Sequence, residues 1–471
     1  MLKCYDAIDR SSGPPSSVSR RSTGKANALL QAPLTWVWSL PHAPEKCRWW
    51  FLALVLTVPG CGRRPAQPVT LTLVGFGMDA GAQLKRDALD DFTRAKGIRV
   101  DLVPAWGTSS EQLSQTSRLL SLRANQPDVY VIDVIWPGTL AAGLLDLTPY
   151  TNQDARAHLP ALLENDTVGG RLVSLPLYVN VGMLYYRTDL LKKYGYHQPP
   201  ATWDELESMA TNIQRGQRAA GNPAFWGYVW QGGAYEGLTC DALEWQGSFG
   251  GGRIIETDGT ISVNNPQAVQ ALRKAEHWVG SISPMGVLSY TESDSLEVFR
   301  AGNAAFLRHW SGALAASRSG NTPIRGRFNV TLLPAGPHGR AQAMGGFHLA
   351  VSRHSAQPRE SAQLVQYLTG SEVQLRRAVS AGYLPTIPRL YRNLDLLKVL
   401  PIAAALQSAG EHAWVARPST VAGSRYGAVS KAYYQAVHDV LSRRTDPAEA
   451  LSQLEKTLVG LTGFRTGAPR N

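Results

Sequence analysis

The sequence has few cysteines, and their spacing builds neither a disulfide framework nor a metal site. Only four occur among 471 residues, at positions 4, 47, 61 and 240. No pair has zinc-ligand spacing, and the histidines form no spaced cluster. We therefore expect no metal and no structural disulfide, with Cys240 as a small, buried apolar side chain.

Motifs of common enzymes are also missing. There is no G-x-S-x-G elbow, no H-E-x-x-H pair, no P-loop, and no G-x-G-x-x-G segment after a predicted strand. These absences argue against serine-hydrolase, zinc-protease, nucleotide-hydrolysing and dinucleotide-dependent chemistry. We expect no cofactor.

The charge pattern differs from that of a nucleic-acid-binding protein. The chain carries 47 Lys and Arg against 36 Asp and Glu, a net charge of +11. Seven of the basic and three of the acidic residues fall in residues 1–60, and the rest are scattered without a polybasic run. A mildly basic surface is the simplest interpretation, and no nucleic-acid partner is expected.

No long apolar run follows residue 61, so the main part of the chain has no predicted membrane span. One short run, residues 49–58, stands behind Lys46 and Arg48 and leads into Val58-Pro59-Gly60-Cys61. A basic start, a short apolar core and a small-residue exit are typical of a secretory signal. The alternative is a buried core helix.

A cysteine directly after such an exit resembles the lipobox of bacterial lipoproteins, in which this cysteine is acylated. The resemblance implies that Cys61 is lipidated and anchors the protein to a membrane. We expect residues 1–60 to be a poorly structured N-terminal extension with the signal, and residues 61–68 to be a tether. Because the signal begins near residue 46, an over-long assigned start is the simplest explanation for residues 1–45.

Periodicity after residue 68 predicts alternating strands and helices. Residues 69–74 and 98–102 alternate in polarity as strands do, and residues 84–92 repeat apolar side chains at helical spacing. Residues 129–135 form a nearly continuous apolar strand, typical of a parallel sheet that is buried on both faces. Strand, helix and strand in this order predict an α/β fold.

Later segments carry helix-start signals and further strands. Capping boxes are predicted at Thr202 with Glu205 and at Ser371 with Gln374, and helices are predicted to start at Pro266 and Pro447. Strands are expected at residues 172–181, 183–187, 328–333 and 348–351.

Asp133 interrupts the apolar run of residues 129–135. A carboxylate is costly to bury there without partners, and this one lies near the carboxyl end of its strand. Open α/β sheets bind ligands at that edge. We therefore assign Asp133 to a ligand site, with a structural cap of the turn before Pro137 as the alternative.

Aromatic residues gather in a glycine-rich stretch with Glu236 and Asp241. They are Trp226, Tyr228, Trp230, Tyr235, Trp245 and Phe249. Rings stack on the C–H faces of sugars, and carboxylates or guanidinium groups bind their hydroxyls. Core packing is the alternative for any single ring. Asp133 and Glu236 also leave open a secreted carbohydrate-active enzyme with two catalytic carboxylates.

Residues 69–462 resemble the extracellular solute-binding proteins, family 1, of ABC sugar importers, and within them the trehalose/maltose- and glucosylglycerol-binding types. The resemblance rests on the order of residues 128–138, 175–189, 202–206, 236–245, 299–310, 345–351, 382–386 and 417–420.

The resemblance implies a two-lobed periplasmic-binding-protein fold of type II, which closes on a sugar between its lobes. Lobe 1 is expected to comprise residues 69–179 and 345–394, and lobe 2 residues 180–344 and 395–463. The implied protein is not an enzyme. It is a monomer in the periplasm or at the cell surface that passes a di- or oligosaccharide to the transmembrane subunits of an ABC permease. A binding module for sensing or adhesion is a further alternative.

The resemblance also implies a set of ligand-binding residues. They are Asp79, Thr108, Asp133, Tyr178, Asn180, Glu236, Trp310, Gly346, Phe347 and Arg417. Trp310 takes the place of the stacking Trp of an N-W-P-Y-like motif, although Ser311 and Gly312 replace its Pro and Tyr. Phe347 stands where the family's G-G-W segment has Trp. The phenyl ring keeps a face for stacking but lacks the indole N–H donor.

Overall fold

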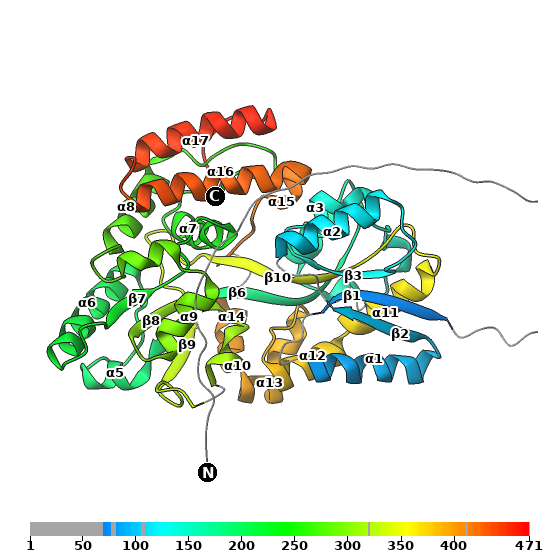
Figure 1. Cartoon of the computed structure of the whole chain (residues 1–471), viewed down its shortest axis with the longest axis horizontal. Coiled ribbons are helices and arrows are strands. Elements are labelled where there is room, and N and C mark those ends of the chain that lie inside the picture. The colour runs from blue at the N-terminus through cyan, green and yellow to red at the C-terminus, as the bar shows by residue number, and fades with distance from the viewer. Residues whose placement is uncertain are drawn as a thin grey trace, which may run out of the picture. The chain divides into compact units, whose positions relative to one another are not determined.

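One mixed sheet runs through the part of the chain that the structure, a computed structural model, describes (Figure 1). The described residues are 69–76, 82–104, 109–153, 155–318, 321–409 and 413–470. Cys61, Asp79, Thr108 and the predicted signal and tether lie outside them. The sheet has the strand order β2-β1-β3-β10-β6-β8-β7, with β11 paired to β10 and β9 paired to β6.

The strands of this sheet are β1 (Thr70–Phe76), β2 (Arg99–Pro104), β3 (Val129–Asp133), β6 (Leu175–Arg187), β7 (Trp226–Val229), β8 (Ala304–Trp310), β9 (Phe328–Leu332), β10 (Gln342–Val351) and β11 (Trp414–Val415). A separate short pair consists of β4 (Thr167–Val168) and β5 (Arg171–Leu172).

The helices before β10 are α1 (Ala82–Lys96), α2 (Ser109–Ser121), α3 (Pro137–Leu140), α4 (Pro160–Asn165), α5 (Thr188–Lys193), α6 (Trp203–Ala219), α7 (Glu236–Ser248), α8 (Pro266–Trp278), α9 (Glu292–Arg300) and α10 (Ala313–Arg318). Those after it are α11 (Pro358–Thr369), α12 (Ser371–Ala381), α13 (Leu394–Val399), α14 (Ile402–Ala409), α15 (Ser419–Ala422), α16 (Tyr426–Leu441) and α17 (Pro447–Thr462).

The first three strands form the predicted parallel layer. Leu73 of β1 pairs with Leu102 of β2 on one side and with Val129 of β3 on the other. Their apolar side chains meet Phe92 of α1 and Leu364 of α11 in one core. The β2 end of the sheet is therefore an α/β layer, as the periodicity predicts.

Two long antiparallel strands connect the β2 end with the β7 end. The first half of β6 pairs with β10, and its second half pairs with β8 and β9. The expected break between residues 181 and 183 is wrong, because Gly182 continues the strand. A Cβ atom at Gly182 would lie 2.8 Å from Cδ of Glu244 on α7, so glycine permits a close approach of helix to strand.

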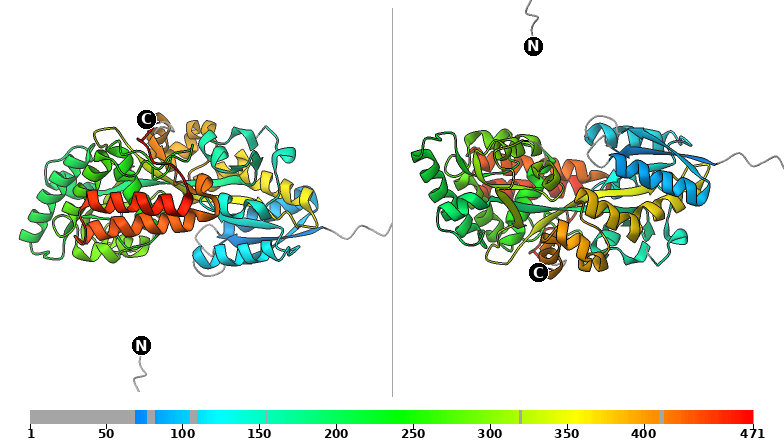
Figure 2. Two further views of the ribbon diagram at one scale, coloured as in Figure 1. Left: turned by 90° about the horizontal axis from the view of Figure 1, so that it is seen from above. Right: turned by 90° about the horizontal axis from the view of Figure 1, so that it is seen from below.

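The β7 end is built around helices and tryptophans. Helices α16 and α17 pack against each other and against α8, and α16 also packs on α7 (Figures 1 and 2). The largest buried rings of this core are Trp203, Trp230, Trp245, Trp278 and Tyr433. Because α7 packs against α8 and α16 on one side and against β10 on the other, its position beside the crossing strands is fixed.

Most helix starts agree with the sequence signals, and one does not. The Thr202 hydroxyl accepts the Glu205 N–H at 3.2 Å at the start of α6, and the Glu205 carboxylate accepts the Ala201 N–H at 2.6 Å. The box predicted at Ser371 is wrong, because the Gln374 side chain donates to the Thr369 carbonyl at 2.6 Å instead. Among the described residues, no helix combines the length and apolar character needed to cross a membrane.

Candidate functional site

The strand register places five of the predicted site residues on one face of the sheet. Phe347 pairs with Asp133 on one side and with Tyr178 on the other. Along the same face follow the pairs Gly345 with Asn180 and Gly182 with Trp310. Residues directly opposite each other on paired strands point to the same side. Asp133, Phe347, Tyr178, Asn180 and Trp310 therefore share one surface of the crossing strands.

Three rings form an aromatic group at the β2 end of this face. The Tyr178 ring lies 5.6 Å from the Phe347 ring and 4.4 Å from the Tyr383 ring, measured between centroids. All three side chains are partly exposed. Tyr383 is an addition to the predicted residues. It lies in the 382–386 segment, but its proximity to Tyr178 is a tertiary contact that no local pattern signals.

Gly346 lies between the paired residues and has a φ of +130°. L-residues rarely adopt this conformation, and a Cβ atom here would contact the Tyr178 carbonyl oxygen and lie 3.0 Å from Cα of Val179. Glycine is thus needed for the close approach of β10 to β6. Its contribution to the site is backbone geometry.

Arg417 connects two carboxylates, one at the end of β3 and the other at the start of α7. Its Nη1 donates to Oε1 of Glu236 at 2.8 Å, and its Nη2 lies 3.9 Å from Oδ1 of Asp133. Nη2 also donates to the Met344 carbonyl at 3.3 Å. The side chain is only 6% exposed. Such a buried guanidinium holds Asp133, Glu236 and β10 in one cluster.

The two carboxylates differ in how much of their acceptor capacity the protein uses. Glu236 accepts hydrogen bonds from Arg417, from the Tyr426 hydroxyl and, at 2.5 Å, from the Ser430 hydroxyl. Asp133 accepts the Ile135 N–H at 3.2 Å and faces Arg417 at the longer distance. Burial raises the pKa of Asp133 above its ordinary value, while Arg417 acts in the opposite direction.

Trp310 lies at the end of β8 with defined contacts around its ring. The Arg308 guanidinium lies 4.3 Å from the ring centroid. The indole N–H donates to the Glu292 carboxylate at 3.2 Å. A Cβ atom on Gly345 would lie 3.0 Å from the far edge of the indole, so glycine makes room for the ring. The orientation of Trp310 is thus set by charged groups on one side and bare backbone on another.

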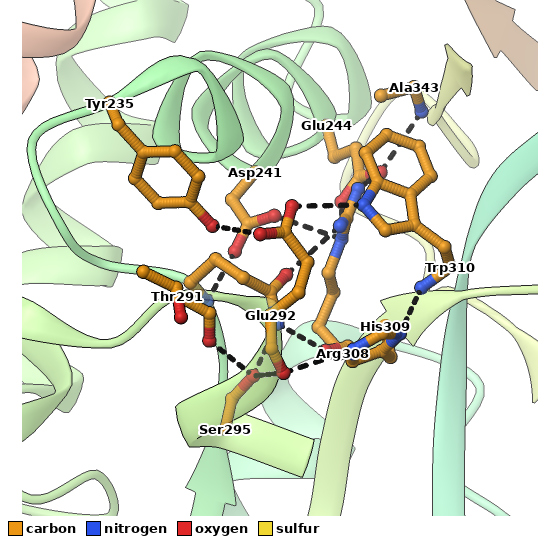
Figure 3. Close-up of polar contacts among 11 residues, drawn as sticks. Tyr235, Asp241, Glu244, Thr291, Glu292, Ser295, Arg308, His309, Trp310 and Ala343 are labelled. Carbon is orange, nitrogen blue, oxygen red and sulfur yellow. Dashed lines mark hydrogen bonds and ion pairs between the residues drawn. The ribbon is translucent and has the colours of Figure 1, made fainter. Parts of the chain in front are cut away.

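A fully buried ion cluster lies behind Trp310 (Figure 3). Arg308 contacts Asp241 at 2.9 Å and Glu244 at 2.5 Å, both from helix α7. Glu244 also accepts the Ala343 N–H of β10 at 3.0 Å. Burial raises the pKa of both carboxyls against the opposing effect of Arg308. The cluster joins α7, β8 and β10, and it uses Asp241 as a structural ion rather than a ligand group.

Three of the six rings in the glycine-rich stretch are fully buried in the core. Tyr228, Trp230 and Trp245 are at most 1% exposed, and the Trp230 and Trp245 rings lie 4.9 Å apart, edge to face. Core packing, the alternative for single rings, is therefore correct for these three. Cys240 is buried as a free thiol, as expected.

The structure thus brings together Asp133, Tyr178, Asn180, Glu236, Trp310, Gly346, Phe347 and Arg417 around the crossing strands. No group of three or more His, Cys, Asp or Glu side chains with metal-binding geometry occurs within the described ranges. Glu292, Tyr426 and Ser430 are additional residues whose contacts become visible only in the folded chain.

Residues 77–375 match the family model described as "Bacterial extracellular solute-binding protein". The chain belongs to this family. It is 45% identical over 412 residues to a "Probable ABC transporter-binding protein" of Deinococcus radiodurans, and the match covers 87% of this chain and 98% of the relative. The relative supports the family assignment over almost its whole length.

Solved structures agree with this assignment. Maltose-bound MalE3 of T. maritima is 34% identical, with a TM-score of 0.75 over 83% of this chain and all of that one. The GacH receptor of Streptomyces glaucescens, solved without ligand and in complex with acarbose, is 21% identical and has the same fold, with a TM-score of 0.73 over 84% of this chain and 99% of that one. The solute-binding protein described here therefore has the two-lobed α/β fold of type II, and it belongs to a family of binding proteins rather than enzymes.

Proposed function

We propose that this protein binds a neutral di- or oligosaccharide of the maltose, trehalose or glucosylglycerol type and delivers it unaltered to an ABC permease. The observation that carries the proposal is the shared face of rings and hydrogen-bonding groups on the crossing strands. Rings at both ends suit the apolar faces of sugar rings, and carboxylate, amide and guanidinium groups between them suit hydroxyls. The similarity to maltose-bound MalE3 of T. maritima supports the same class of ligand.

We infer a distinct role for each group of the site. Trp310 and Phe347 stack on sugar rings, with Tyr178 supporting Phe347. Asp133 accepts hydroxyl hydrogens, because the protein leaves more of its acceptor capacity free than that of Glu236. Asn180 accepts the Ser311 hydroxyl at 3.1 Å through Oδ1, which directs its amide nitrogen toward a ligand oxygen.

Glu236 and Arg417 act as a pair in this proposal. Because Glu236 is held by Tyr426 and Ser430, it fixes the guanidinium of Arg417 beside Asp133. A fixed guanidinium loses less conformational freedom when a ligand binds. Asp79 and Thr108, which follow β1 and precede α2, complete the proposed ligand shell from lobe 1.

The proposed lobes meet in the middle of β6 and β10. We place lobe 1 at residues 69–179 and 345–394, and lobe 2 at residues 180–344 and 395–463. The paired residues Asn180 and Gly345 then mark the crossing point, and packing of α14 on β9 supports the inclusion of residues after 395 in lobe 2. A ligand that contacts both Asp133 and Trp310 favours the closed arrangement of two such lobes.

Asp133→Asn tests the ligand site directly. Calorimetric titration with maltose, trehalose, sucrose and glucosylglycerol should show binding of at least one sugar to the wild type. Analysis of that sugar after incubation with the protein should recover it intact. Loss of a hydrogen bond to a charged group corresponds to about 1.5–3 kcal/mol, so the variant should bind about 10- to 150-fold more weakly. The matched control is Asp101→Asn, whose side chain is 56% exposed on β2. Equal affinities of the Asp133 variant and the wild type contradict the assignment.

A second part of the proposal concerns the membrane. We propose that the protein works outside the cytoplasmic membrane as a monomer, held there by acyl chains on Cys61. Several acyl chains give stable anchoring, whereas one is marginal. Metabolic labelling with a fatty acid and membrane fractionation should show label and membrane retention for the wild type, and neither for Cys61→Ser. Equal membrane retention of both forms speaks against the anchor.

A further inference from the structure

Trp310 has one partner whose role the proposed ligand site does not explain. Glu292, the first residue of α9, accepts the indole N–H through Oε1 and the Tyr235 hydroxyl, at 2.6 Å, through Oε2 (Figure 3). We propose that Glu292 is the positioning residue that orients the Trp310 ring for ligand stacking. The stacking of Trp310 on a ligand rests on the proposed function, whereas the orientation of the ring by Glu292 does not require a ligand.

The indole N–H leaves little choice of partner. Tryptophan has a single donor and no acceptor, and a partly buried indole needs that donor satisfied. The Glu292 carboxylate lies 3.2 Å from Nε1. Its second oxygen is engaged by Tyr235, so the carboxylate is held at both ends. Burial raises the pKa of Tyr235, with Glu292 adding to the effect, so the hydroxyl keeps its proton at neutral pH.

Glu292 also sits on a rigid support. The N-terminus of α9 has a capping box in which Asp294 accepts the Thr291 N–H at 2.8 Å. The Ser295 hydroxyl donates to the Thr291 carbonyl at 3.0 Å. These contacts fix the start of the helix, so the position of the Glu292 carboxylate follows from the fold rather than from side-chain freedom.

The residue beside Trp310 adds a second connection to Glu292. The Trp310 backbone N–H lies 2.9 Å from Nδ1 of His309, and because an N–H can only donate, Nδ1 is the acceptor. Nε2 of His309 then carries the hydrogen and donates to the Glu292 carbonyl at 3.2 Å. Burial lowers the pKa of His309 to about 4, so this neutral tautomer persists at pH 7. Residues 309 and 310 are thus tied to Glu292 through both its backbone and its side chain.

The Arg308 guanidinium lies over one face of the indole, and we infer that the ligand stacks on the other. Arg308 points to the same side of β8 as Trp310, and its strand partner is Leu184, farther into lobe 2 than Gly182. The guanidinium therefore covers the lobe 2 side of the indole. The far edge of the indole lies over Gly345, which pairs with Asn180 on the same face of the sheet. Glu292 fixes the rotation of the ring between these two sides.

Glu292→Ala tests the positioning role, with maltose and trehalose as probe sugars. We expect about 5- to 10-fold weaker binding for Glu292→Ala, whereas Glu292→Gln, which keeps an acceptor for the indole N–H, should stay within about twofold of the wild type. In a Trp310→Phe background, which lacks the N–H, Glu292→Ala should cause no further loss. The matched control is Glu297→Ala on the same helix, whose side chain is 74% exposed. Additive losses in the double variant overturn the proposal.

A second measurement does not depend on a ligand. The indole Nε1–H resonance of Trp310 in nitrogen-15-labelled protein, assigned by its loss in Trp310→Phe, should shift and exchange faster with solvent in Glu292→Ala. It should stay unchanged in Glu297→Ala. An unchanged resonance in Glu292→Ala overturns the positioning role whether or not sugar binds. Failure of the wild type to bind any sugar, together with a shifted resonance, overturns the proposed function alone.

Discussion

Replacing Gly182 by alanine should break the ion cluster behind Trp310. A Cβ atom at this position of β6 would overlap Oε1 of Glu244 and lie 2.9 Å from Nη2 of Arg308. Both neighbours are fully buried and bonded to each other, so neither can shift without losing hydrogen bonds. The Glu244 carboxylate must therefore leave its place, and with it the hydrogen bonds from Arg308 at 2.8 and 2.5 Å and from the Ala343 N–H at 3.0 Å.

The expected loss follows from these contacts. Breaking a buried, hydrogen-bonded ion pair destabilises a protein by about 3–5 kcal/mol. Arg308 keeps its contact with Asp241, whereas the displaced Glu244 carboxylate loses its partner. The strand itself does not oppose alanine, so the effect isolates the clash with Glu244. We therefore expect the free energy of unfolding of Gly182→Ala to be about 3–5 kcal/mol below that of the wild type, measured by urea denaturation followed by circular dichroism.

Gly427→Ala on helix α16 is the matched control. A Cβ atom there meets no atom within 4 Å, and alanine is about 1 kcal/mol more favourable than glycine inside a helix. The control should therefore be as stable as the wild type or slightly more so. If both variants unfold at the same urea concentration, β6 and α7 are not as close as the ion cluster requires, and the reasoning is refuted.

Two further predictions concern stability. Burial lowers the pKa of His158 to about 3, so below about pH 6.5 the unfolded chain binds a proton that the folded chain does not. The free energy of unfolding should therefore decrease as the pH is lowered from about 6.5. At pH 5 this term amounts to about 2 kcal/mol, so the decrease in the free energy of unfolding between pH 7.5 and pH 5, measured by urea denaturation, should be about 2 kcal/mol smaller for His158→Gln than for the wild type. The decrease that remains in the variant includes His309, whose pKa burial also lowers. Thr202→Ala should cost about 1 kcal/mol through loss of the cap at the start of α6, whereas Thr211→Ala, later on the same helix, should be nearly neutral in the same assay; equal losses would contradict the capping role.

Local sequence predicts the helix starts and the first strands well. The Asn265 side chain accepts the Ala268 N–H at 2.9 Å, and the Asp446 side chain accepts the Ala448 N–H at the same distance, each before a proline. These caps act over three residues or fewer, so the pattern alone contains the cause. The Gln374 side chain instead bonds to Thr369 and Thr386, because tertiary partners outcompete the local box.

Rings in the core and rings in the site cannot be separated from sequence. Trp230 and Trp310 each stand two residues before a glycine, yet Trp230 donates to Ser283 within the core while Trp310 donates to Glu292. Their different surroundings come from contacts more than fifteen residues away along the chain. The same holds for Asp241, which is buried against Arg308, a residue 67 positions later in the chain. Composition therefore predicts which residue types a site contains, whereas packing between distant segments decides which of those residues lie in the site and which lie in the core.

Three consecutive residues of β10 explain why the selected groups lie together. Ala343 binds Glu244 of α7, Met344 binds Arg417, and Gly345 makes room for Trp310. Two residues farther on, Phe347 pairs with Asp133 of lobe 1. The groups that we assign to the proposed lobe 2 are therefore attached to the same strand as those of the proposed lobe 1. β10 thus joins the contacts of Glu244, Arg417 and Trp310 to the pair of Phe347 and Asp133 within one continuous strand, which no local pattern in the sequence signals.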